Sequence, residues 1–223
     1  MKATRTLPET YVLYSDFRPS KFKKVLWVIW LFGLLVAAAS FTFFNKLSSI
    51  LRPEFQPVKR LHFEVPTLDR LRTLPIVVVS VAVTLIVHEF IHALCLWIFT
   101  GERPIIVAKG GGLCVRLPSW YLSRNAFLVT NLAPVCLISL AGLLLLPVVP
   151  QSSISLLVFC AAMNVAGSIA DVVSSVYVLL HPRSVYLDTD GTIYTGGPQG
   201  SKRAPKWRQR LRSSIEWTLA KLE

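Results

Sequence analysis

Long apolar stretches alternate with shorter polar segments along most of the chain. An α-helix rises about 1.5 Å per residue, so about 20 consecutive apolar residues are needed to cross a hydrocarbon layer of about 30 Å. Four stretches reach this length: Val25–Phe44, Leu74–Phe99, Ala126–Val149 and Ile154–Leu180. The first follows a polar lead of 24 residues, which is long for a signal peptide, and we interpret it as a retained anchor. The pattern predicts an all-α integral membrane protein with four transmembrane helices.

Two shorter segments have the pattern of β-hairpins. Ile105–Pro118 contains two apolar strands on either side of Gly110-Gly111-Gly112, which predicts a small β-hairpin or re-entrant loop between the second and third helices. Tyr186–Tyr194 predicts another hairpin, which turns at Asp190-Gly191.

The end of the chain is basic and has apolar residues at helical spacing. This pattern indicates an amphipathic helix on the inner membrane leaflet, with a solvated tail as the alternative. The apolar positions are Trp207, Leu211, Ile215, Leu219 and Leu222. We therefore predict a cytoplasmic N-terminal segment (1–24), a four-helix transmembrane domain (25–180), and a cytoplasmic hairpin with a basic amphipathic tail (181–223).

Composition and charge agree with a membrane protein and give its orientation. Only 16% of the residues are charged and 53% are hydrophobic, whereas soluble domains have about 25% charged residues. With four spans, 18 of the 24 Lys and Arg residues fall on the side that holds both termini. Because basic loops stay inside, both termini are predicted to be cytoplasmic and to face an anionic inner leaflet. The net charge of +12 thus needs no nucleic-acid partner, and no nucleic-acid-binding motif is present.

Only two of the twelve acidic residues, Glu89 and Asp171, lie well inside an apolar stretch. A charge at bilayer depth costs at least about 2.5–3.5 kcal/mol, so such residues mark candidate functional sites. His88 and His92 flank Glu89 and share one helical face, which lets two imidazoles bind one zinc ion while Glu89 reaches the water that the ion binds. A chance match is the alternative, but it would bury three polar groups without compensation.

Asp171 is the candidate for a third zinc ligand. His92 lies seven residues before the end of the second stretch and Asp171 nine before the end of the fourth. Both stretches run from outside to inside, so both side chains are expected roughly 10–14 Å from the cytoplasmic edge. Two histidines and a carboxylate would leave a fourth position open for water, as catalytic zinc sites require.

Other polar residues near this depth have no settled role. Asn164, Ser168 and Ser175 form a stripe with Asp171 that either lines the metal cavity or bonds to neighbouring helices. Asn131 precedes a proline that can kink the third helix, and its role stays open together with that of Asn164. Cys95 lies near the metal-facing side, where a small apolar filler is the favoured interpretation and a fourth ligand the alternative.

The order of these motifs resembles that of a known family. His-Glu-Phe-Ile-His-Ala at 88–93 is followed by a Gly-rich segment, by Leu132-Ala133-Pro134, by Asn164–Asp171 (Asn-Val-Ala-Gly-Ser-Ile-Ala-Asp), and by the Asp190-Gly191 turn. This order, over about Pro75–Tyr194, resembles the "putative zincin peptidase" family of small prokaryotic membrane proteins. It is more distantly similar to the site-2 proteases, which carry their later aspartate in Leu-Asp-Gly, whereas this chain has Ala170-Asp171-Val172.

The resemblance implies an intramembrane zinc metalloprotease in a prokaryotic cell membrane. Glu89 would activate a zinc-bound water, and the substrate would be a membrane-embedded or juxtamembrane protein segment. The hairpin at Ile105–Pro118 could present a strand edge to it. The alternative is a non-catalytic zinc-binding scaffold or transport component, which needs the ligands but not Glu89. A di-iron enzyme is disfavoured, because it needs about eight histidines and the chain has four. The oligomeric state is not indicated.

Overall fold

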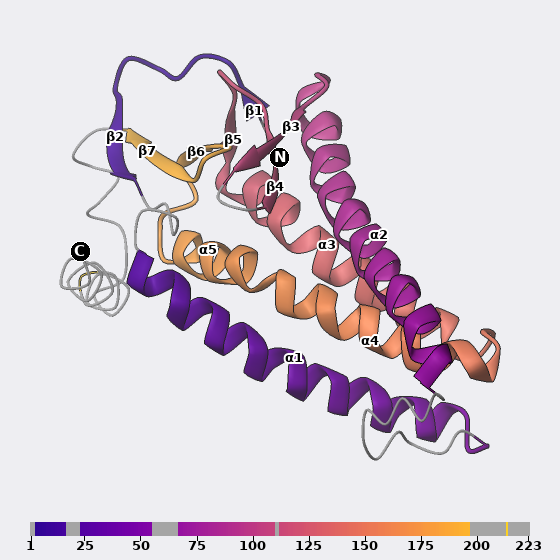
Figure 1. Ribbon diagram of the computed structural model, residues 1–223. Coiled ribbons are helices and arrows are strands. Elements are labelled where there is room, and N and C mark those ends of the chain that lie inside the picture. The colour runs from indigo at the N-terminus through magenta and orange to yellow at the C-terminus, as the bar shows by residue number, and fades with distance from the viewer. Residues whose placement is uncertain (1–2, 17–22, 55–66, 110–111, 197–212, 214–223) are drawn as a thin grey trace. The chain divides into compact units, whose positions relative to one another are not determined.

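The computed structural model describes residues 3–16, 23–54, 67–109, 112–196 and 213. Figure 1 shows its helices, which are α1 (Lys23–Leu51), α2 (Thr67–Thr100), α3 (Arg124–Leu145), α4 (Gln151–Gly167) and α5 (Ile169–Leu179). The chain forms two compact units: one comprises Met1–Trp30, Glu89–Ala133 and Ile169–Glu223, and the other Leu31–His88 and Pro134–Ser168. Helices α1, α2 and α3 therefore contribute residues to both units.

Three helices are long and apolar enough to cross a membrane: α1 over Leu31–Leu51, α2 over Leu74–Thr100, and α3. Helices α4 and α5 pass the same test only as a bent pair, so the chain has four spans if this pair is one broken span. The stretch expected as the fourth span, Ile154–Leu180, is therefore formed by two helices that meet at a bend of 42°.

The break between α4 and α5 has a local cause. The carbonyl oxygen of Asn164 accepts hydrogen bonds from both the backbone N–H (3.0 Å) and the hydroxyl (2.8 Å) of Ser168. The backbone of Ser168 has φ −77° and ψ 0°, outside the helical range. Gly167 precedes it, and sharp bends in helices occur at such Gly/Ser pairs.

The first unit contains a five-stranded antiparallel sheet of order β1-β5-β6-β7-β2 (Figure 1). The strands are β1 (Ala3–Thr4), β2 (Tyr11–Asp16), β5 (Tyr121–Ser123), β6 (Tyr186–Asp188) and β7 (Thr192–Gly196). The prediction of an all-α protein is thereby corrected to a mostly helical one with small sheets. Strands β1 and β2 come from the N-terminal segment and cover the two edges of β5-β6-β7, which would otherwise expose unpaired backbone groups.

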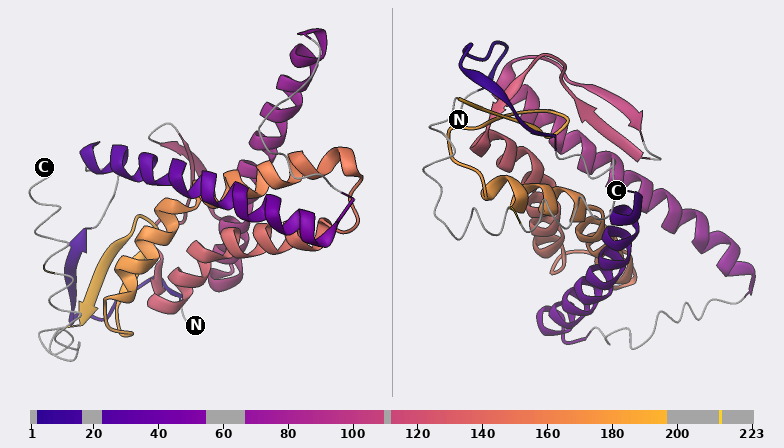
Figure 2. Two further views of the ribbon diagram at one scale, coloured as in Figure 1. Left: turned by 90° about the horizontal axis from the view of Figure 1, so that it is seen from below. Right: turned by 90° about the vertical axis from the view of Figure 1, so that its left-hand side faces the viewer.

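Both hairpins expected from the sequence are present. Strands β3 (Ile105–Lys109) and β4 (Gly112–Arg116) pair antiparallel as a separate two-stranded ribbon, visible in the right-hand view of Figure 2. Strands β6 and β7 form the second hairpin, with Gly191 at φ +87° in its turn. The carboxylate of Asp188 accepts the N–H groups of Asp190 and Thr192 there, each at 2.9 Å.

An apolar core joins this sheet to the helices that carry candidate site residues. Leu187 and Ile193 on the hairpin are fully buried and belong to one cluster with Phe127 of α3 and with Tyr177 and Val178 of α5. The side chains of Asp171 on α5 and Asn131 on α3 thus project from helices fixed against a common sheet.

The second unit is helical among the described residues. Phe44 of α1 packs in a buried cluster with Leu146, which follows α3, and with Ile154, Val158 and Ala161 of α4. The predicted amphipathic tail lies outside the described residues, except that Ser213 is helical.

Candidate metal centre

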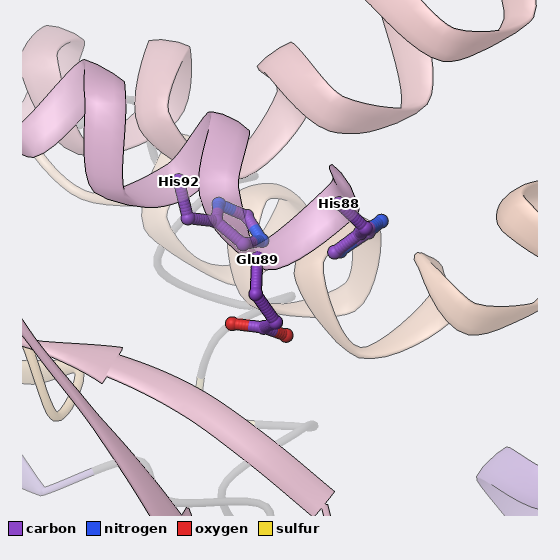
Figure 3. A group of neighbouring side chains, drawn as sticks. All are labelled: His88, Glu89 and His92. Carbon is purple, nitrogen blue, oxygen red and sulfur yellow. The ribbon is translucent and has the colours of Figure 1, made fainter. Parts of the chain in front are cut away.

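Helix α2 presents three metal-binding side chains from one turn. One ligand atom each from His88, Glu89 and His92 lies within 4.8 Å of the others, and the described residues contain no other such group. Figure 3 shows the three side chains leaving the same stretch of helix. Between residues 74 and 100 the buried side chains are His88, His92 and Leu96, spaced four apart. The motif therefore lies on the narrow protein-facing stripe of a helix whose other faces are apolar and exposed.

The orientation of the His92 ring is fixed by the backbone of α3. Its Nδ1 lies 2.8 Å from the carbonyl oxygen of Thr130, which can only accept a hydrogen bond. Nδ1 must therefore carry the proton, and in the neutral ring the lone pair is on Nε2. Metal-binding histidines are oriented by such a bond from the other ring nitrogen.

Asp171 of α5 faces the other ring nitrogen of His92. Its Oδ2 lies 3.5 Å from His92 Nε2. Two acceptor atoms so close need a cation between them, either a proton on the ring or a metal ion. Atoms bound at about 2.0–2.1 Å to one tetrahedral ion lie roughly 3.3 Å apart, so the spacing fits two zinc ligands. Asp171 is not a member of the group formed by the α2 side chains.

His88 has an orienting partner that the sequence did not identify. Its Nδ1 lies 3.0 Å from Oδ1 of Asn164 on α4, and the exposed fraction of Asn164 is 1%. An amide oxygen accepts, so Nδ1 donates, and in the neutral ring the lone pair that can bind a metal is on Nε2. Matched depth did not predict this pair, because His88 lies one helical turn before His92 whereas Asn164 lies two turns before Asp171.

The remaining candidates lie around this centre with different roles. The hydroxyl of Ser168 is used at the helix break, and Ser175 is buried at 2% exposure. Asn131 lines a cavity together with Asp171. Cys95 is a partly buried free thiol and is not part of the α2 group.

The donor set suits zinc. It consists of two imidazoles, each with Nδ1 held by an oxygen acceptor, and neighbouring carboxylates, in a segment largely free of other charges. Asp171 and His92 belong to the first unit, and His88 and Asn164 to the second.

Comparison with known proteins agrees with the motif. No curated protein and no solved structure matches the chain. One family model matches just under half of it, and that match contains the whole of the α2 motif, Asn164 and Asp171. Residues 81–186 match the family described as "Putative zincin peptidase", as the order of motifs predicted.

Proposed function

We propose that this protein is an intramembrane zinc metalloprotease that hydrolyses peptide bonds in membrane-embedded or juxtamembrane protein segments. His88, His92 and Asp171 would hold the zinc ion, and Glu89 would be the catalytic base. The observation that carries the proposal is the arrangement of His92, whose Nδ1 donates to the Thr130 carbonyl while Nε2 lies 3.5 Å from Asp171.

Zinc bound by these residues would supply an activated water and a Lewis acid for the substrate carbonyl. Glu89 lies in the same helical turn as both histidines and is a carboxylate in a partly buried site. It would accept the proton of the attacking water and donate it to the amine that leaves when the C–N bond breaks. Asn164 and the Thr130 carbonyl would hold both imidazoles with Nε2 toward the metal.

The membrane setting limits the substrate. Helix α2 carries the motif within a span of 27 residues, Leu74–Thr100, that is long enough to cross a bilayer. A peptide bond reaching the motif must belong to a segment that enters the membrane or lies at its surface. The cytoplasmic position of both termini, and a substrate approaching from that side, are part of the proposal.

The decisive feature is Glu89, because a zinc scaffold or transport component requires the ligands but not the base. We would purify the full chain, measure bound zinc, and follow cleavage of membrane-spanning peptides in vesicles by mass spectrometry. Glu89→Gln should retain zinc and lose cleavage, by about 10²- to 10⁴-fold. Glu54→Gln, at an exposed carboxylate after α1, is the matched control and should leave bound zinc and the cleavage rate unchanged. Equal cleavage by wild type and Glu89→Gln would exclude the protease, and zinc without cleavage in either would favour the scaffold.

A further inference from the structure

A cavity of about 160 Å³ adjoins Asp171. It lies within the first unit, between α3, α5 and the turn of the β6–β7 hairpin at residues 189–191. The carboxyl group proposed as a zinc ligand therefore forms part of its wall. A void of about 150 Å³ accommodates a benzene molecule, so this cavity has room for one amino-acid side chain.

The walls combine apolar and hydrogen-bonding groups. Phe127, Tyr177 and Val178 form the apolar part, and each is less than 7% exposed. Asn131 and Ser174 supply polar side chains from α3 and α5. Pockets of this composition select ligands through a few polar groups on an apolar surface.

The turn that lines the cavity is held in place by the last residue of β4 and by the residue that follows it. The guanidinium of Arg116 forms an ion pair with Asp190, and Thr189 Oγ1 accepts the N–H of Leu117 at 3.3 Å. Gly191 has the left-handed backbone that the turn requires. The wall is therefore preorganised, and the charge of Asp190 is already balanced.

The charges and polar groups decide which side chain fits. An acidic side chain would meet no basic residue among those that line the cavity, and the guanidinium of Arg116 is already paired with Asp190. A basic one would find Asp190 paired with Arg116 and Asp171 proposed to bind zinc. An aliphatic one would remove Asn131 and Ser174 from water without returning hydrogen bonds. An uncharged side chain with donors and acceptors of its own, such as that of Asn or Gln, can form hydrogen bonds with Asn131 and Ser174 and adds no charge.

We infer that this cavity is the specificity pocket of the proposed protease and binds one uncharged, hydrogen-bonding side chain of the substrate next to the bond that is cleaved. This inference rests on the proposed function, because the cavity adjoins the cleaved bond only if Asp171, which lines it, binds the catalytic zinc. It adds the class of substrate residue that the site selects.

The test uses zinc-loaded full-length protein in vesicles and a set of peptides with one apolar span. Each of six positions at the cytoplasmic flank carries Gln, Leu, Lys, Glu or Gly in turn, and cleavage sites are mapped by mass spectrometry. At one position relative to the cut bond, Gln should be cleaved at least about fivefold faster than Leu, Lys or Glu. Asn131→Leu, similar in size but apolar, should remove or reverse the preference for Gln over Leu. Ser174→Leu should reduce cleavage of Gln peptides more than that of peptides with Gly at this position.

Ser184→Leu makes the same change at an exposed position outside the pocket and should keep the wild-type preference. If cleavage shows no preference at any position, or if both pocket variants keep the wild-type preference, the cavity is not a specificity pocket, although the protein is still a protease. A preference for Leu, Lys or Glu overturns the assigned chemistry. No cleavage of any peptide by zinc-loaded wild type overturns the proposed function and the pocket with it.

Discussion

Replacing Asn164 by alanine should weaken zinc binding although Asn164 is not itself a proposed ligand. The change removes Oδ1, which accepts the proton of His88 Nδ1 at 3.0 Å. The His88 ring then loses its fixed tautomer and orientation. Loss of such an orienting partner typically costs 10- to 100-fold in metal affinity, or about 1.4–2.8 kcal/mol.

Because the site is buried, the same change also affects folding. The buried Nδ1–H of His88 would lack its acceptor, which costs about 1–3 kcal/mol of stability. Zinc affinity must therefore be measured by competition with a chelator at a temperature where the zinc-free variant remains folded. Asn164→Asp keeps an acceptor at the same place and should bind zinc at least as tightly as wild type, since a carboxylate raises the basicity of a ligating imidazole.

The matched control for this experiment is Asn125→Ala, at an exposed position in the first turn of α3. It should leave zinc affinity within about twofold of wild type. Asn164 does not orient His88 for zinc binding if Asn164→Ala binds zinc as tightly as Asn125→Ala, or if Asn164→Asp loses as much affinity as Asn164→Ala.

Further variants test other parts of the structure. Asp171→Ala should lower zinc affinity at least tenfold in the same competition assay. An unchanged affinity would show that Asp171 is not a zinc ligand and only forms an ion pair with His92. Arg116→Leu should raise KM for peptides with little change in bound zinc, because the 189–191 turn loses its ion pair; an unaltered KM would contradict this. Val107→Pro should slow cleavage if substrate pairs with the β3–β4 ribbon, whereas Val107→Thr should not, and equal rates would count against strand pairing. Ile193→Ala should destabilise the first unit by about 2–5 kcal/mol, measured by denaturant unfolding in detergent, since Ile193 is fully buried.

Features that depend on local periodicity were predictable from the sequence. The spacing of His88 and His92 alone places both imidazoles on one helical face, and the structure groups them with Glu89. Both hairpins were also predicted, because their strands are neighbours in the chain and their turns contain glycine. Lengths of apolar sequence identified the helices, although hydropathy concealed the break at Ser168.

Features that depend on distant pairing were not predictable. Strand β1 pairs with β5, more than 100 residues later, and β2 pairs with β7, so nothing in the local pattern of the N-terminal segment revealed a sheet. Predicting the contact between Asn164 and His88 requires knowing how α4 is rotated about its axis relative to α2 within the second unit, and hydropathy does not give this rotation. The cavity beside Asp171 is formed by three segments whose packing only the fold determines.

The central claim is that a zinc centre formed by two histidines and a carboxylate lies within α2 and α5. X-ray absorption at the zinc edge of the purified full chain tests it most directly. We expect one zinc per chain, with two imidazole rings and the remaining ligands oxygen, all at about 2.0–2.2 Å. A sulfur ligand at about 2.3 Å, as Cys95 would give, or a shell with fewer than two imidazoles would contradict it.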